Sequence, residues 1–283
     1  MTAAMDHDAR AAWIARAPGA RRGAGGLWRI PLPTPFRGEG RALHALAQEF
    51  PGAGGAAPAL EHLQEARDAA RSEGAIGLVA SCDRVELEAL AREAGFERVG
   101  RVLEVRGRLA PGPPGAEVPL DDAASELISR TNEVHALASS PDPALLHWRF
   151  GEALEAHGAC GVREGERLEA LAVYSVGLGA LEVRAWWASA DAEGLAGRRL
   201  SGALADVAAR AGGLELRLEA PLWSSAARDL LAQGLTLRPS GRSLWVASFE
   251  PRLDLELLRG RWHWQRAEDL GPIGAHPSLE QDS

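Results

Sequence analysis

The sequence predicts an α/β protein built from two similar units. Segments with the apolar spacing of a helix alternate with short apolar or alternating segments, a pattern typical of helices packed on a sheet. A proline- and glycine-rich stretch, Ala110–Pro119, separates two runs of such segments. The separation of Gly74 from Gly95 in the first run equals that of Gly213 from Gly234 in the second. This favours a duplicated unit, and chance agreement of two ordinary strand–helix units is the alternative.

The composition excludes several classes of protein. The chain has 283 residues, enough for about two domains, and 31 basic against 39 acidic residues give it a net charge of −8. Without a basic block, we expect neither nucleic acid nor a membrane as a partner. Two cysteines, Cys82 and Cys160, are too few for a disulfide scaffold and suit a reducing compartment, so we expect a cytoplasmic protein. We find no spacing typical of a metal site and no leader-like apolar run near Met1.

The first run predicts a helix over 57–73, with Leu60, Leu63, Ala66 and Ala70 on one face. The apolar segment 75–80 then suits a buried parallel strand. A second helix is expected over 84–94, with Asp83 as its N-cap and Gly95 as its stop. The alternating segment 96–109 is the next strand or hairpin.

The second run repeats this order. One helical face is formed by Leu200, Leu204, Val207, Ala208 and Ala211. A strand with period 2 follows at 214–218, then a helix over 225–231 that ends near Gly234, and strand residues return at 243–249. We divide the chain into a first domain (1–112), a linker (113–120), a second domain (121–250) and a C-terminal extension (251–283).

Two passages resemble the C-terminal half of a GNAT acetyltransferase domain. Residues 69–80 and 90–100 follow its order of alanine-rich helix, Gly-Ala, strand, helix, Gly-Phe and strand. Residues 145–150 are similar to the entry of the second half of tandem GNAT-like proteins. The resemblance covers most of 27–109 and 121–249. It implies two tandem GNAT-like domains, each a mixed, mostly antiparallel sheet flanked by helices. Strands at 27–36 and 42–50, joined by a hairpin turn at 37–41, would begin the first domain, which looks partial because residues 1–26 must supply everything before them.

The resemblance also implies acetyl-CoA or another acyl-CoA as cosubstrate, held by a glycine-rich loop at the start of a helix. Residues 37–42 match the loop pattern literally, whereas 51–57 lack its basic or amide residue. Spacing favours the second site, because a helix from the first site to Gly74 would be broken by Pro51 and several glycines. An ordinary flexible loop is the alternative. The residues expected to bind the cofactor are Gln48, Glu49, Phe50, Gly52, Ala53, Gly54, Gly55 and Ala56.

The matching loop of the second unit, residues 191–196, carries Asp191 and Glu193. Both carboxylates would repel a diphosphate, so we do not expect the second unit to bind coenzyme A in the same way. Many GNAT enzymes have a tyrosine that protonates the leaving thiolate, four residues before the glycine of the Gly-Phe pair. In this chain that glycine is Gly95 in the first unit and Gly234 in the second, and Ala91 and Leu230 stand at the tyrosine positions.

Glu49 is the candidate general base. The alternative interpretation is that Glu49 is only a solvated carboxylate at the end of a strand. Trp262 and Trp264 are candidates for substrate binding, with packing against the second core as the alternative. The sequence thus predicts an N-acyltransferase that passes an acetyl or acyl group from acyl-CoA to an amine of a small molecule or peptide. A non-catalytic GNAT-like scaffold and a transfer-RNA-dependent aminoacyl transferase are the alternatives.

Overall fold

The structure is a computed structural model, which describes residues 7–36, 39–48, 60–133, 135, 137–138, 142–152, 156–177, 179–190 and 194–263. Its first part has the following elements: α1 (His7–Ala15), β1 (Arg21–Arg22), a 3₁₀ turn (Ala24–Gly26), β2 (Leu27–Phe36), β3 (Glu39–Gln48), α2 (Leu60–Ser72), β4 (Gly77–Cys82), α3 (Val85–Glu93) and β5 (Glu97–Gly107). The strands and helices predicted for residues 27–109 are therefore present, with boundaries shifted by a few residues.

The second part contains a longer series of elements: β6 (Ala116–Glu117), α4 (Asp122–Asn132), β7 (Leu137–Ala138), α5 (Pro143–Leu146), a π-helical turn (His147–Gly151), β8 (His157–Glu164), β9 (Arg167–Val176), β10 (Ala180–Ala188), α6 (Leu195–Arg210), β11 (Glu215–Pro221), α7 (Ser225–Ala232), β12 (Thr236–Ser248), α8 (Leu255–Arg261) and β13 (Trp262–His263). The predicted order of helix, strand, helix and strand after Gly194 is confirmed.

One mixed sheet connects all the larger strands. Its order is β1-β2-β3-β4-β12-β5-β11-β10-β9-β8-β6. Most neighbours are antiparallel, and within the described part of this sheet the parallel pairs are β3/β4 and β10/β11. The predicted fold class, a mostly antiparallel mixed sheet flanked by helices, is confirmed.

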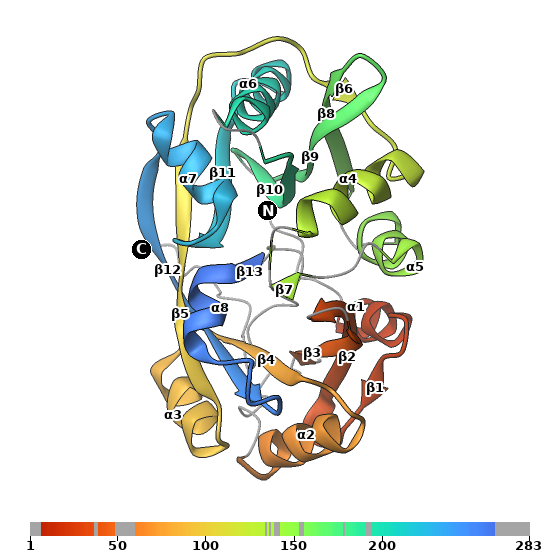
Figure 1. The fold of residues 1–283 in the computed structure, drawn as a ribbon. Coiled ribbons are helices and arrows are strands. Elements are labelled where there is room, and N and C mark those ends of the chain that lie inside the picture. Colours follow the sequence, from red (N-terminus) through yellow and green to blue (C-terminus); the bar gives the residue numbers. More distant parts are fainter. Residues whose placement is uncertain are drawn as a thin grey trace.

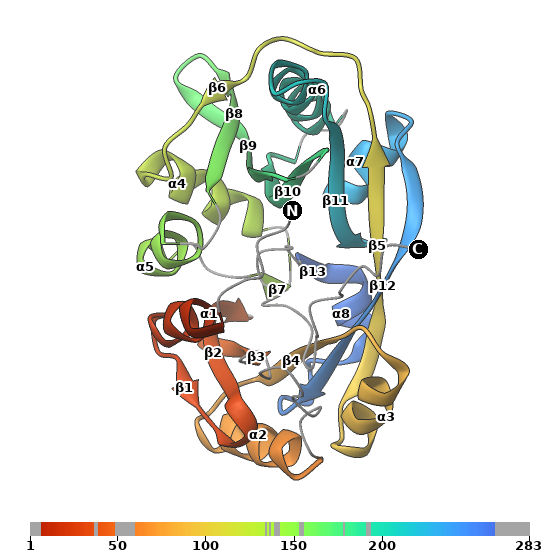
Figure 2. The same cartoon turned by 180° about the vertical axis from the view of Figure 1, so that it is seen from behind.

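The last strand of each half lies in the other half. Strand β12 follows α7 but pairs with β4, while β5 follows α3 but pairs with β11. The two exchanged strands also pair with each other, antiparallel, and both run along one side of the molecule from its upper to its lower part, on the left in Figure 1 and on the right in Figure 2. The arrangement β3-β4-β12 is thus repeated as β10-β11-β5, as expected for a duplicated unit with a pseudo-twofold relation. The division into domains at the linker stays a prediction, since one sheet runs through both halves.

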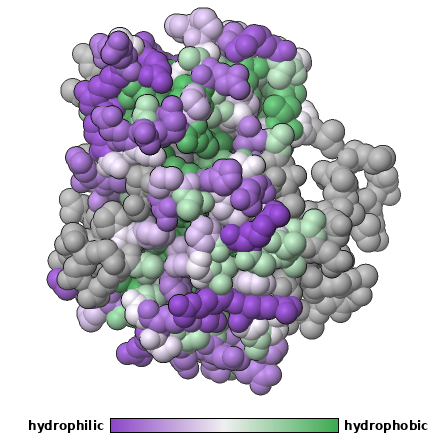
Figure 3. All heavy atoms as spheres, turned by 90° about the vertical axis from the view of Figure 1, so that its right-hand side faces the viewer, coloured by the Kyte–Doolittle hydropathy of each residue, from purple (hydrophilic) through white to green (hydrophobic). Residues whose placement is uncertain are grey.

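Periodic apolar residues explain why the helices lie on the sheet. Leu63, Ala66 and Ala70 of α2 are buried, as the spacing predicts, and so are Leu200 and Leu204 of α6. Burying this apolar surface offsets much of the entropy lost on folding. One side of the molecule carries mostly hydrophilic residues, with hydrophobic residues gathered in its upper part (Figure 3).

Glycines end the helices where the sequence predicts. Gly74, Gly95, Gly213 and Gly234 have φ angles of 79°, 84°, 75° and 93°, a left-handed conformation that glycine adopts without strain. The predicted N-cap of α3 is wrong. Arg84 is the N-cap, with an extended backbone and no capping side-chain bond, because the helix begins only at Val85.

A pair of tryptophans joins the two halves on the side of α1. The rings of Trp13 and Trp148 stack with centroids 4.6 Å apart. Each indole nitrogen donates to the other residue's carbonyl oxygen, Trp13 at 3.3 Å and Trp148 at 2.8 Å. These contacts tie the N-terminal helix to the π-helical turn of the second part.

Candidate functional site

The parallel strands β3 and β4 separate from each other towards their C-terminal ends. Their pairing comprises Leu43 with Gly77, His44 with Leu78, and Ala45 with Val79. Both strands continue past these pairs, β3 to Gln48 and β4 to Cys82. Because β4 stays paired with β12 over its whole length, the opening lies between β3 and β4. We call this opening the first splay.

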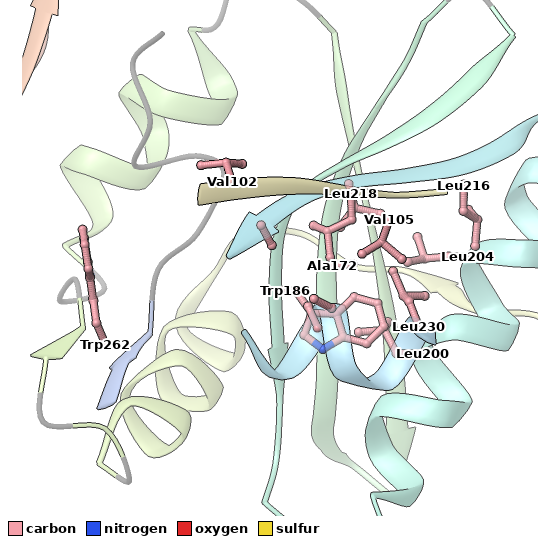
Figure 4. Close-up of a cluster of buried hydrophobic side chains, with 14 of the residues drawn as sticks. Val102, Val105, Ala172, Trp186, Leu200, Leu204, Leu216, Leu218, Leu230 and Trp262 are labelled. Carbon is pink, nitrogen blue, oxygen red and sulfur yellow. The ribbon is translucent and has the colours of Figure 1, made fainter. Parts of the chain in front are cut away.

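A second splay lies between β10 and β11. Their pairing ends at Val183 with Leu218, while β10 continues to Ala188 and β11 to Pro221. A register shift between Val183 and Ala185 marks a β-bulge in β10. The bulge reverses the alternation of side chains, so Val183 and Trp186 both belong to the core under α6 and α7. Trp186 lies beside Leu200 and Leu230 there (Figure 4).

Both splays open at the middle of the molecule. Cys82, the last residue of β4, pairs with Ser243, and Ser243 pairs with Arg101. Pro221, the last residue of β11, pairs with Val102, the residue next to Arg101. The C-terminal ends of β4 and β11 therefore lie at the same level, with two strands, β12 and β5, between them. Both splays therefore open towards the same central level of the sheet.

The residues predicted to bind the cofactor lie at the first splay or directly after it. Gln48 is the last residue of β3. Glu49, Phe50, Gly52, Ala53, Gly54, Gly55 and Ala56 lie outside the described residues. The flanking elements agree with the predicted loop position, because residues 43–48 form a strand and the next helix, α2, begins at Leu60. The role of these residues stays a prediction.

The two positions at which GNAT enzymes would carry a tyrosine are filled by small or apolar core residues. Ala91 of α3 is 1% exposed and Leu230 of α7 is fully buried. Tyr174, the sole tyrosine of the chain, is on β9, and its ring lies against Gly158. Burial raises the pKa of the Tyr174 phenol. Tyr174 pairs with Val183 of β10, where the second splay begins, but its ring is directed towards β8, on the other side from β11.

The N-terminal turn of α6 faces a carboxylate. A Cβ atom added to Gly197 would lie 2.2 Å from Oδ2 of Asp229, which places this oxygen directly against the helix. Asp229 belongs to α7, and α6 begins at Leu195 after the left-handed Gly194. A carboxylate there occupies the positive end of the helix and would repel a diphosphate. This supports the prediction that the second half does not bind coenzyme A in the usual way.

The C-terminal extension reaches the centre of the molecule. Trp262 is 3% exposed and belongs to the largest apolar cluster, which favours the packing alternative over substrate binding; Trp264 lies outside the described residues. Nδ1 of His263 lies 2.9 Å from Nε2 of His135, within hydrogen-bond distance. Burial, and then His135, lower the pKa of His263 to about 3, so the ring is neutral at physiological pH.

His44 and Cys82 of the first half have packing roles. His44 is buried on β3, and its Nδ1 lies 3.6 Å from Oε2 of Glu73, whose Oε1 accepts a bond of 2.8 Å from Arg29. Burial lowers the pKa of His44, and the nearby Glu73 partly offsets this. Cys82 is fully buried at the end of β4.

A charged pocket opens beside the second splay. Its volume is about 170 Å³, and it is lined by Glu182, Val183, Arg184, Arg217, Glu219 and Arg242. The residues come from β10, β11 and β12, and their charged groups pair with one another. Sequence reasoning missed this pocket, although the alternation of Glu215, Arg217 and Glu219 with leucine and alanine marks the polar face of β11.

Comparisons with solved structures identify the architecture. A GCN5-related N-acetyltransferase from Anabaena variabilis is 14% identical, with a TM-score of 0.56, and the match covers 78% of this chain and 58% of that chain. Saccharomyces cerevisiae N-myristoyltransferase with bound myristoyl-CoA is 11% identical, with a TM-score of 0.55 over 78% and 62% of the two chains. The chain has a GNAT-like fold.

A further solved structure with this fold is matched over nearly its whole length. The GCN5-related N-acetyltransferase from Kribbella flavida is 15% identical, with a TM-score of 0.52, over 87% of this chain and 95% of that chain. By contrast, this chain spans only about three fifths of the Anabaena variabilis and Saccharomyces cerevisiae proteins. No protein-family model matches the sequence, and no curated protein matches it. Among the helices of the described residues, none is long and apolar enough to cross a membrane.

Proposed function

We propose that this protein is an N-acyltransferase that moves an acetyl or other acyl group from acyl-CoA to an amine of a small molecule or peptide. The observation that carries the proposal is the first splay, a pair of parallel strands that separates just before a glycine-rich connection to α2. Glycines let backbone N–H groups approach a phosphate closely, and the N-terminus of α2 adds positive potential. Structures with this fold include N-acyltransferases that share little sequence with the chain.

In the proposed complex, the diphosphate of acyl-CoA lies on the backbone of residues 52–56, and the acyl arm enters between β3 and β4. The ammonium group of the acceptor loses a proton, with Glu49 as the candidate base, and the neutral nitrogen attacks the thioester carbonyl carbon; the nitrogen gives up its second proton to solvent as the amide forms. A C–N bond forms and the C–S bond breaks. Because Ala91 and Leu230 supply no acid, the thiolate takes its proton from solvent.

Calorimetric titration with acetyl-CoA tests the cofactor site. We expect saturable binding to the unaltered chain and a loss of at least tenfold in affinity for Gly54→Asp, because the new carboxylate would face the diphosphate. Gly165→Asp is the matched control, since Gly165 lies in the β8–β9 turn at φ 60° with no atom within 4 Å of an added Cβ. Absence of heat at millimolar ligand, or equal weakening by both variants, would remove the proposal.

The second candidate function is that of a non-catalytic binding or scaffold protein with a GNAT-like fold. The buried Ala91 and Leu230, together with Pro51 in place of a basic loop residue, favour it. The two candidates differ in turnover. Release of the coenzyme A thiol in the presence of acetyl-CoA and a panel of primary amines identifies an enzyme, whereas saturable binding of acetyl-CoA without release of thiol with any amine identifies a binding protein.

A further inference from the structure

The charged pocket beside the second splay is built from both signs of charge. Three guanidinium groups, of Arg184, Arg217 and Arg242, and two carboxylates, of Glu182 and Glu219, line it. Their side chains are between 19% and 34% exposed, so water screens them less than it screens charges on an open surface. The lining has one positive charge more than it has negative charges.

The ion pairs within the pocket differ in the distance between their charged groups. Arg184 lies 3.0 Å from Glu182, and Arg242 lies 3.3 Å from Glu219. Arg217 has longer contacts, 3.5 Å to Glu104 and 3.6 Å to Glu182. Its Nε atom is buried beside Glu104, so a ligand would reach the Nη groups of this partly exposed side chain. A guanidinium prefers two short parallel bonds to one carboxylate, so Arg217 is the group that a ligand carboxylate would best satisfy.

The pocket also lies close to the first splay. Arg242 precedes Ser243, which pairs with Cys82 at the end of β4. Neighbouring strands are about 4.8 Å apart, so this wall of the pocket is one strand away from the mouth where the acyl group of the proposed cosubstrate would end. All six lining residues belong to the second half of the sequence, but Arg242 lies on β12, the strand that pairs with β4 of the first half.

We propose that this pocket binds the head group of a small amino acid, with Arg217 holding the carboxylate and Glu219 holding the protonated amine. The inference rests on the proposed function and names the class of acceptor. Two carboxylates in the lining disfavour a simple anion, and three guanidinium groups disfavour a polyamine. The volume of about 170 Å³ is below the roughly 300–1,000 Å³ of pockets for drug-sized ligands, so the ligand has few heavy atoms.

Calorimetry without acyl-CoA tests the pocket on the full chain. The probes are glycine, L-alanine, β-alanine and 4-aminobutyrate, compared with propionate and propylamine, which each carry one of the two charged groups. We expect at least one amino acid to bind saturably and both single-group probes to bind at least tenfold more weakly. Since a hydrogen bond to a charged group is strong, Arg217→Gln and Glu219→Gln should each lower the affinity by about 10- to 100-fold.

Arg210→Gln is the matched control, because Arg210 forms an exposed pair with Asp206 on α6 away from the pocket. It should leave binding unchanged. The inference is overturned if propionate binds as well as every amino acid, if no amino acid binds, or if the two pocket variants bind like the control. Acetyl-CoA binding without amino-acid binding would refute this inference alone, and the reverse result would refute the proposed cofactor site alone.

Discussion

The exchange of β5 and β12 predicts that the two halves unfold together. Trp245 belongs to β12, the last strand of the second half in sequence, yet it pairs with Ala80 of β4 and packs in the core under α2 and α3. Its indole is 1% exposed, and Nε1 donates a 2.8 Å bond to Oγ of Ser243. Trp245→Ala would therefore leave a cavity in the first half and also remove one hydrogen bond.

The expected loss is large compared with the stability of a typical protein. Truncating a buried tryptophan to alanine costs about 3–5 kcal/mol, out of a total of roughly 5–15 kcal/mol. For a chain of this size, each kcal/mol lowers Tm by about 2–4 °C, which gives a decrease on the order of 10 °C. Leu204→Ala, in the fully buried core under α6, should cost about 2–5 kcal/mol.

Differential scanning calorimetry and urea denaturation followed by circular dichroism measure the effect. We expect a single transition in the unaltered chain, and each of the two core variants should shift the whole transition. Leu237→Ala is the control on the same strand, because Leu237 is 42% exposed and its truncation should change stability little. Two separate transitions, of which Trp245→Ala moves only one, would refute the reasoning that the shared strands couple the halves.

Three further predictions concern single side chains. Gly197→Ala should lower Tm, because its Cβ would collide with Oδ2 of Asp229; Gly177→Ala, whose added Cβ would come no closer than 3.4 Å to Glu182, serves as control. Burial raises the pKa of Cys160 to about 11, so in a Cys82→Ser variant a thiol reagent at pH 8 should label Cys160 only after denaturation; fast labelling of the folded chain would contradict this. Burial lowers the pKa of His263 to about 3, so below pH 6.5 this residue takes up a proton in the unfolded chain before it does so in the folded chain. The free energy of unfolding should therefore be highest above pH 6.5 and decrease as the pH is lowered to 3, by at most about 1.4 kcal/mol per pH unit. In urea titrations His263→Gln should flatten this fall, and an unchanged slope would argue against the neutral buried ring.

The sequence determined the local elements because their causes are local. Apolar residues at helical spacing predict α2 and α6, and the glycines at 74, 95, 213 and 234 end helices in a conformation that other residues rarely adopt. The order of these elements was sufficient to indicate the GNAT-like fold before any strand pairing was known. Asp83 was an error of one residue, of the size expected when a helix start is inferred from residue types alone.

The candidate site was predictable only in part. The position of the glycine-rich loop followed from spacing, and the strand before it and the helix after it are where that spacing requires. The contact of Asp229 with the start of α6 could not be inferred from the sequence. Asp229 lies on α7, which is separated from α6 by β11, and only the folded chain brings the two helices together. The pocket was hidden for the same reason, since Glu182, Arg217 and Arg242 are far apart in the chain and each resembles an ordinary residue on the solvent side of a strand.

The tertiary structure alone decided which strands pair across the halves. A strand such as β12 has the same local pattern whether it pairs within its own half or beside β4, because its alternation specifies a buried and a polar face but no partner. The partner is selected by the free energy of the whole sheet and its two layers of helices, which includes contacts between residues more than a hundred positions apart. The shared centre of the molecule, and with it both proposed ligand sites, exists only after that selection.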